Sequence, residues 1–207
     1  MRPRLLLLAT FFATLVLSAS LAESSALVFQ SDFGEKDGAV ASMRGVAYGV
    51  SPELKIFDLT HEIPTFDIWA AAYRLNQVAS YWPEGTVFVS VVDPGVGTDR
   101  RSVVLKTKSG HYFVTPDNGT LTLVADELGI AGVREIDEAV NRLKNSEKSY
   151  TFHGRDVYAY TGAKSWNPKC AACRMPNRLE TKTSFLATSR FWMCTMATSG
   201  PTSRGLC

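Results

Sequence analysis

The sequence predicts an α/β domain with a mixed, largely parallel sheet flanked by helices. Short runs of β-branched and aromatic residues alternate with segments whose apolar residues recur at helical spacing, and several of these runs end in turns rich in Gly, Pro and Asp. Strands that alternate with helices pair in parallel, because each helix returns the chain to the same end of the sheet. A hydrophobic content of 45% and a charged content of 20% are ordinary for a globular protein and indicate no class of partner.

The expected elements follow one another along the chain. In the first half they are strand 26–29, a helix beginning after Asp37-Gly38, strand 55–57, helix 67–79 and strand 86–89. Residues 102–107 and 112–114 are then expected to form a hairpin through Ser109-Gly110, and residues 121–128 a short helix. The polar residues 141–148 indicate a solvated loop.

Residues 1–22 have the composition of a secretory signal peptide. Arg2 and Arg4 precede an apolar run over residues 5–17, and small residues follow where a signal peptidase would cut. The run is shorter than a membrane span requires, which favours cleavage over an uncleaved anchor and predicts no stable membrane span. We expect an exported chain, periplasmic or secreted, whose folded domain covers residues 23–162.

Residues 163–207 differ in composition from the rest of the chain. They contain seven Lys and Arg residues against the single Glu180, all four Cys residues and no sustained helix or strand period. Cys170 and Cys173 form a C-x-x-C without a second such pair, which does not support a zinc ribbon, and the basic residues are too scattered to predict nucleic-acid binding. Disulfides could form after export, in a pairing that the sequence does not determine. We expect an atypical, Cys-rich, poorly ordered tail of frameshifted or otherwise foreign origin.

Asp93 begins the stretch with the densest polar chemistry. It opens a loop, Asp93-Pro94-Gly95-Val96-Gly97, in which the glycines let the backbone approach a ligand closely. Arg100 follows seven positions after Asp93, near enough to return its guanidinium to the carboxylate. The alternative is an ordinary turn in which Asp93 only caps backbone amides.

Asp32 and Asp58 also stand where a strand is expected to end. In open α/β sheets ligands bind beyond the carboxyl ends of the strands, so three such acids, with Asp93, favour one polar pocket over three separate turns. Neither the loop that contains Gly34 nor the loop that contains Gly97 has the spacing of a dinucleotide or Walker phosphate loop. The sequence therefore lacks the motif of a nucleotide-phosphate site.

His153 supplies a further reactive group, with open backbone space beside it at Gly154. Asp93, Arg100 and His153 together offer a carboxylate, a fixed cation and a titratable imidazole. These groups are enough to orient and deprotonate a water for attack on an electrophilic carbon. The three histidines of the chain lack the spacing of a metal site, and no G-x-S-x-G elbow supports a serine nucleophile. No metal is therefore expected.

An ordered set of short motifs, running from about residue 26 to residue 162, resembles one known family. The motifs are Ser31-Asp32-Phe33-Gly34 with Asp37-Gly38, Asp58-Leu59-Thr60-His61, Gly85-Thr86-Val87-Phe88, Asp93-Pro94-Gly95-Val96-Gly97-Thr98, Pro116-Asp117-Asn118-Gly119 and Thr151-Phe152-His153-Gly154-Arg155-Asp156. In this order they resemble the S-adenosylmethionine hydroxide adenosyltransferase family, which is related to the bacterial fluorinase and chlorinase.

The resemblance implies hydrolysis of S-adenosylmethionine to adenosine and methionine, with attack of water or hydroxide on the ribose C5′ and without a metal or other cofactor. It assigns Asp93, Arg100 and His153 to catalysis. It also assigns Asp32 to the ribose diol and Phe152 to the border of the nucleoside.

The halogenating relatives carry Tyr where this chain has Asp93 and Ser where it has Gly154. A carboxylate activates water but repels a halide, which favours the hydroxide branch of the family. Further pocket candidates are Asp37, Phe66 and Asn118. For each of them a purely structural role is equally open.

The resemblance also implies a homotrimer in which a C-terminal β-barrel domain supplies contacts to adenine and methionine. No barrel-like pattern follows residue 162, so we expect this domain to be absent and hydrolysis to be impaired. Two alternatives stay open: a noncatalytic domain that binds a nucleoside or S-adenosylmethionine, and an exported Cys-rich interaction module. Turnover of S-adenosylmethionine to adenosine separates the first of them from the enzyme.

Overall fold

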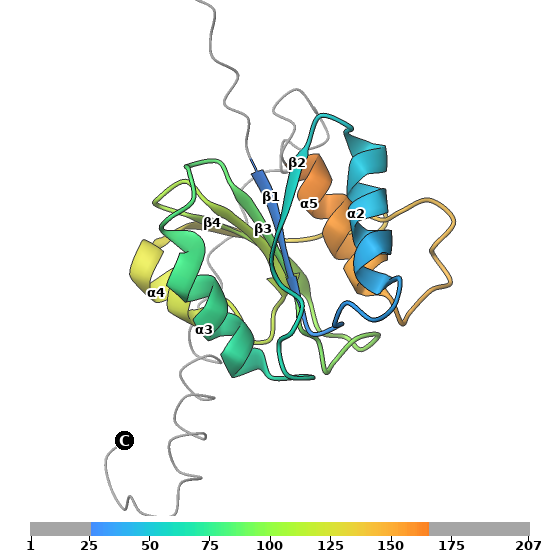
Figure 1. Cartoon of the computed structure of the whole chain (residues 1–207), viewed down its shortest axis with the longest axis horizontal. Helices are drawn as coiled ribbons and strands as arrows, with labels where there is room; N and C mark the ends of the chain where they lie inside the picture. The colour runs from blue at the N-terminus through green and yellow to red at the C-terminus, as the bar shows by residue number, and fades with distance from the viewer. Residues whose placement is uncertain (1–25, 166–207) are drawn as a thin grey trace, which may run out of the picture.

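Six strands form one mixed sheet in the computed structural model, which describes residues 26–165 (Figure 1). In chain order the strands are β1 (Ala26–Ser31), β2 (Lys55–Thr60), β3 (Val87–Val91), β4 (Ser102–Thr107), β5 (Tyr112–Pro116) and β6 (Ile130–Glu135). Their order across the sheet is β2-β1-β3-β5-β4-β6. β4 is antiparallel to both of its neighbours, and the other pairs are parallel. The predicted mixed, largely parallel sheet is confirmed.

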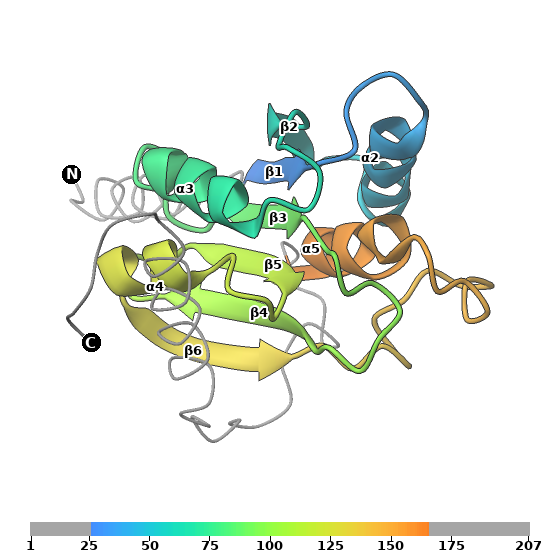
Figure 2. The same cartoon turned by 90° about the horizontal axis from the view of Figure 1, so that it is seen from below.

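Helices cover both faces of this sheet. They are α2 (Ala39–Val50), α3 (Ile68–Ala79), α4 (Thr122–Leu128) and a π-helix, η1 (Gly154–Ala159), that continues into α5 (Tyr160–Ser165). α2 packs against η1 and α5 on one face, and α3 packs against α4 on the other (Figures 1 and 2). The expected alternation of strands and helices up to β3 is confirmed.

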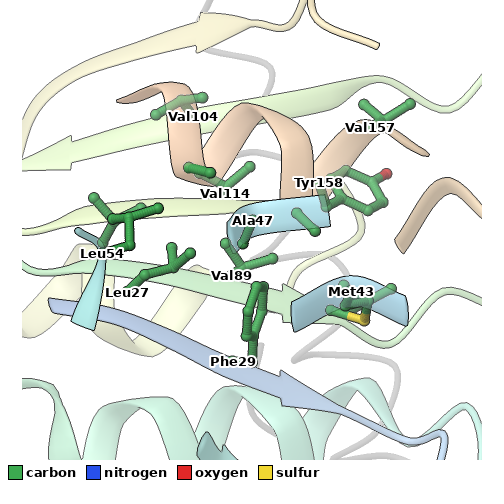
Figure 3. Close-up of a cluster of buried hydrophobic side chains, with 14 of the residues drawn as sticks. Leu27, Phe29, Met43, Ala47, Leu54, Val89, Val104, Val114, Val157 and Tyr158 are labelled. Carbon is green, nitrogen blue, oxygen red and sulfur yellow. The ribbon is translucent and has the colours of Figure 1, made fainter. Parts of the chain in front are cut away.

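One core cluster lies between the sheet and the layer formed by α2, η1 and α5 (Figure 3). In it, Leu27, Phe29 and Val89 of the central strands share a buried cluster with Met43 of α2. The last described helix lies so close to β3 that a Cβ on Gly162 would be 2.4 Å from Cγ2 of Val89. Glycine at this position therefore lets α5 rest directly on the sheet.

Asp67 caps the N-terminus of α3, since its carboxylate accepts a hydrogen bond from the amide of Ala70 at 2.8 Å. Trp69 and Tyr73, two of the apolar residues that predicted this helix, are each 47% exposed. The helix instead buries small side chains such as Ala71, because these let its backbone approach the sheet closely.

Two features of the sheet differ from the sequence-based expectations. The sequence predicts no strand over residues 130–135, where β6 pairs with β4 as a partly buried edge strand. Asp58 lies within β2, opposite Phe29 of β1, and not beyond the end of the strand. Its expected position beyond the strand end is therefore wrong, and its carboxylate accepts a hydrogen bond from Arg44 and lies 2.9 Å from Nε2 of His61.

The expected signal peptide, residues 1–22, and nearly all of the expected tail, residues 166–207, lie outside the described residues. α5 continues past the predicted domain boundary at residue 162, and Ala163 is buried in the core. Within residues 26–165, no helix has the length and apolar character needed to cross a membrane.

Candidate active site

β1 and β3 carry Asp32 and Asp93 to the same edge of the sheet. The two strands are parallel neighbours whose last residues lie opposite each other in register, so the residues after them leave the sheet together. Asn118 follows β5, which is the next parallel strand, and its Nδ2 donates to the carbonyl of Val92 at 2.8 Å. The Asn118 amide therefore ties a third strand end to the base of the Asp93 loop.

The loop after β3 folds back on itself and on a distant segment. Asp93 Oδ1 accepts a hydrogen bond from the Gly95 amide at 3.0 Å, and the Thr98 hydroxyl donates to the Gly95 carbonyl at 2.7 Å. Gly97 has a φ of 78°, and a Cβ there would lie 2.9 Å from the carbonyl oxygen of Tyr150. The loop can therefore touch the segment that leads to His153 only because residue 97 has no side chain.

Arg100 forms an ion pair with Asp93. Nη2 of the guanidinium donates to Asp93 Oδ2, and the two side chains are 14% and 5% exposed. Nη1 donates to the Tyr158 hydroxyl at 3.2 Å. Burial raises the pKa of Asp93 above its ordinary value, while the charge of Arg100 and the amide of Gly95 oppose that shift. A carboxylate with a raised pKa is a stronger base than one in water.

His153 lies at the N-terminal end of η1, 7% exposed, within electrostatic reach of this ion pair. Burial lowers the pKa of His153 below its ordinary value; the carboxylates of Glu138 and Asp93 oppose this shift, whereas Arg142 adds to it. The imidazole is therefore neutral at neutral pH. The structure brings Asp93, Arg100 and His153 together, and their catalytic roles stay predictions.

Asp32 and Phe66 form a second part of the site. Asp32 Oδ2 accepts a hydrogen bond from the Phe66 amide at 2.8 Å. Phe66 has a left-handed φ of 63°, which is strained for a bulky residue, and its side chain is 59% exposed. The hydrogen bond ties the Asp32 carboxylate to the backbone of a residue whose aromatic side chain is exposed.

The remaining predicted site residues are divided between the site and the scaffold. Phe152 packs edge-on against Phe33, with ring centroids 5.7 Å apart, and the Arg155 guanidinium lies 4.9 Å from the Phe152 ring centroid. Asp37 is exposed and accepts a hydrogen bond from the Ala39 amide at 2.8 Å at the start of α2. Asp37 therefore stabilises the turn that leads into α2, and no bond in the described chain links it to the other candidates.

Four residues of the site gave no signal in the sequence: Ser102, Glu138, Arg142 and Tyr158. The Tyr158 hydroxyl lies 3.0 Å from Ser102 Oγ, which donates to Glu138 Oε1 at 3.1 Å. Glu138 Oε2 accepts from Arg142 at 2.7 Å, and Nη2 of Arg142 lies 3.3 Å from Nε2 of His153. These residues come from β4, the loop after β6 and η1, so only the fold assembles them.

A second chain of polar groups, in which Ser31 and His61 are buried, resembles a hydrolase triad in composition. Ser31 Oγ lies 2.7 Å from Nδ1 of His61, whose Nε2 lies 2.9 Å from Asp58 Oδ1. Ser31 is fully buried, at 0% exposure, and its hydroxyl also accepts from the Phe33 amide. A substrate cannot reach such a hydroxyl, so this chain serves to fix the end of β1, from which Asp32 leaves the sheet.

A cleft of about 590 Å³ opens beside the site and is lined by residues 98–102 and 135–138. Of the three catalytic candidates, only Arg100 lines it, so the cleft adjoins the site and is not the space among its residues. Within residues 26–165, no three potential metal ligands of the His, Cys, Asp and Glu types gather in one place.

The fold and the site together define a class of α/β protein that holds a carboxylate, a guanidinium and an imidazole at the carboxyl edge of a mostly parallel sheet. The family model described as the SAM hydroxide adenosyltransferase N-terminal domain matches residues 27–171. The chain belongs to this family, and the resemblance inferred from the motifs is confirmed.

Curated relatives include two enzymes named (R)-S-adenosyl-L-methionine hydrolase. Those of Methanocaldococcus jannaschii and Salinispora tropica are 43% and 42% identical over 141 and 137 residues, and each match covers 66% of this chain and 51% of the relative. A fluorinase of an Actinoplanes species is 28% identical over 159 residues, covering 66% of this chain and 52% of the relative. The chain thus spans about half the length of the curated relatives it matches.

A solved structure shows the same fold. The crystal structure of an uncharacterized conserved protein from Thermotoga maritima matches with a TM-score of 0.69 and 39% sequence identity, covering 74% of this chain and 59% of that one.

Proposed function

We propose that this chain hydrolyses S-adenosylmethionine to adenosine and methionine. The observation that carries the proposal is the buried Asp93–Arg100 ion pair with a neutral His153 near it. Two curated relatives that are 43% and 42% identical to the chain are named for hydrolysis of this substrate, which supports the proposal.

In the proposed reaction a water oxygen attacks C5′ of the ribose as a proton passes from the water to the Asp93 carboxylate. The C5′–S bond breaks with its electron pair going to sulfur, which leaves as the neutral thioether of methionine. Arg100 keeps the Asp93 carboxylate oriented, since it binds one carboxylate oxygen while the Gly95 amide binds the other. This orientation supplies the in-line approach that displacement needs.

The Asp32 and Phe66 pair is suited to the nucleoside. A carboxylate accepts hydrogen bonds from hydroxyl groups, so Asp32 fits the ribose diol. The exposed Phe66 ring and the Phe152 ring offer apolar surfaces for the base and the sugar. We assign substrate binding to these three residues, and Asn118 acts by fixing the backbone below Asp93.

The test is incubation of the purified full-length chain with S-adenosylmethionine in water enriched in oxygen-18. We expect adenosine that carries the label at its 5′ oxygen, together with an equal amount of methionine. The same reaction in chloride or fluoride salts should give no 5′-halogenated nucleoside. Binding of S-adenosylmethionine or adenosine in a calorimeter without formation of adenosine would replace hydrolysis by the alternative function, noncatalytic nucleoside binding.

We also propose that the chain is exported and that it assembles as a homotrimer. Export is supported by the charge and apolar run of residues 1–22, and cell fractionation with N-terminal sequencing of the mature protein tests it. The trimer is supported by the resemblance to the family alone, and sedimentation equilibrium tests it. A mature protein that retains residue 1 would contradict the proposed export. A monomer at assay concentration would contradict the proposed trimer.

A further inference from the structure

Arg142 is held on all sides although it lies in the polar segment 141–148 that the sequence predicts as a solvated loop. Its side chain is 10% exposed. Nη1 donates to the carbonyls of Ser146 and Ser149 at 3.2 and 3.1 Å. Nη2 donates to Glu138 Oε2 at 2.7 Å and lies 3.3 Å from Nε2 of His153. Each amino group of the guanidinium has two hydrogens, so both groups are saturated and the guanidinium has one orientation.

The contact between Arg142 and His153 has only one possible direction. A guanidinium has donors and no acceptor, so Arg142 donates and His153 Nε2 accepts. Nε2 then carries no proton, and the proton of the neutral ring is on Nδ1. We propose that Arg142, held in place by Glu138, is a positioning residue that keeps His153 in the neutral Nδ1–H tautomer.

The charges that face His153 agree with this arrangement. They are those of Glu138, Arg142, Asp93 and Arg100. Burial and the two guanidinium charges favour the neutral ring, whereas the two carboxylates favour the imidazolium. Arg142 is thus both the donor that selects the tautomer and one of the charges that disfavour a second proton.

The tautomer has a consequence for the reaction, and this step rests on the proposed function. An imidazole whose Nε2 is occupied by a guanidinium donor cannot take a proton from water at that atom. His153 is left with an Nδ1–H group, which donates a hydrogen bond. Asp93 is then the group that accepts the proton of the attacking water. His153 orients the oxygen of that water through its Nδ1–H group.

Nitrogen-15 spectroscopy of the histidine rings tests the tautomer without any need for activity. The full chain contains three histidines, so a sample labelled at histidine gives few signals, and the His153→Gln variant identifies those of His153. At neutral pH we expect an unprotonated Nε2 and a protonated Nδ1 at His153. A protonated Nε2 in the folded wild-type protein would overturn the proposal.

Substitutions of Arg142 and of Glu138 should shift the His153 pKa in opposite directions. Arg142→Met removes the donors and the positive charge while Glu138 remains, so the His153 pKa should rise and the tautomers should mix. Glu138→Gln removes a negative charge, so the His153 pKa should fall. Arg142→Lys keeps the charge and a donor and should restore the wild-type tautomer. Lys144→Met, at an exposed position of the same loop, is the matched control and should change neither property.

If Arg142→Met does not fold, as far-ultraviolet dichroism would show, the isosteric Glu138→Gln variant still tests the sign. An unchanged His153 titration in every folded variant would overturn the proposal. In parallel, kcat/KM for S-adenosylmethionine is measured against pH, and its acid limb should move upward in Arg142→Met and not in Lys144→Met. If His153 has the expected tautomer but the protein does not turn over S-adenosylmethionine, the proposed hydrolysis is wrong. The positioning role of Arg142 would still stand in that case.

Discussion

The Tyr158 hydroxyl accepts a hydrogen bond from Nη1 of Arg100 at 3.2 Å, across 58 positions in the chain. Burial raises the pKa of Tyr158 to about 12, so its hydroxyl keeps its proton and donates to Ser102 Oγ at 3.0 Å. Ser102 in turn donates to Glu138. The guanidinium that orients Asp93 and the carboxylate that holds Arg142 are therefore ends of one hydrogen-bonded chain.

Tyr158→Phe should weaken both stability and turnover. It leaves a buried guanidinium and a buried serine each without one partner, which typically costs about 1–3 kcal/mol of unfolding free energy. The loosened Arg100 should lower kcat/KM by roughly tenfold, the factor that corresponds to about 1.4 kcal/mol. Urea unfolding and steady-state kinetics measure the two effects. Tyr48→Phe, at a position 59% exposed on α2, is the control, and equal behaviour of the two variants would contradict the prediction.

Asp93→Asn should remove turnover and keep nucleoside binding, because the amide has the shape of the carboxylate and lacks its basicity. Loss of a general base typically lowers kcat by about 10²–10⁴-fold. Calorimetry with adenosine and an adenosine-formation assay separate the two properties. Asp99→Asn changes an exposed acid of the same loop and should leave both intact. Undiminished turnover in Asp93→Asn would take Asp93 out of the mechanism.

His153 should make the folded state less stable at acid pH. Its folded pKa lies below the ordinary value of 6.5, so the folded protein binds this proton more weakly than the unfolded chain does. Above the ordinary value of 6.5 the ring is neutral in both states, so His153 costs no stability there. As pH falls from that value towards the folded pKa, the unfolded chain takes up the proton first and the free energy of unfolding decreases. We expect the unfolding free energy of the wild type, relative to His153→Gln, to fall as pH drops below about 6.5. Denaturant titrations measure it, and a flat difference would be evidence against a lowered pKa.

Gly154→Ser should destabilise the protein and disturb the aromatic pair at the site. A Cβ at residue 154 would lie 3.0 Å from two ring atoms of Phe33 and 3.1 Å from Cγ1 of Val91. Such overpacking costs about 1–3 kcal/mol and should displace the Phe33 ring from Phe152. Thermal unfolding measures the cost. Gly45→Ser is the control, since nothing lies within 4 Å of a Cβ there, and it should not destabilise the protein.

Phe66→Gly should separate ligand binding from stability. Glycine relieves a left-handed conformation that costs about 1 kcal/mol or more in a residue with a side chain, so unfolding free energy should stay equal or rise. Removal of the exposed ring should weaken binding of adenosine. Asn145→Gly, at the other described non-glycine residue with a positive φ, is the control for strain alone. Undiminished adenosine affinity in Phe66→Gly would show that the ring does not contact the base or the sugar.

Local sequence patterns were sufficient for the fold class and for two of the three acids predicted at strand ends, Asp32 and Asp93. Each central strand is a run of apolar, β-branched or aromatic residues because both of its faces are buried, and β1 and β3 are buried along their whole length. The edge strand β6 is partly exposed, so its residues carry no such run, and the sequence did not predict it. Asp58 was misplaced because a strand end cannot be located to within two residues from composition alone.

The chemistry of the Asp93 loop is likewise local, since Arg100 returns to an acid seven positions away. Only the tertiary structure decided how His153 is presented. Its tautomer depends on Arg142, and the orientation of Arg142 depends on Glu138 and on two backbone carbonyls of the loop. Hydrogen bonds of this kind are directional and short-ranged, so they exist only once the sheet and η1 have brought the groups within about 3 Å, and no spacing along the chain encodes that distance.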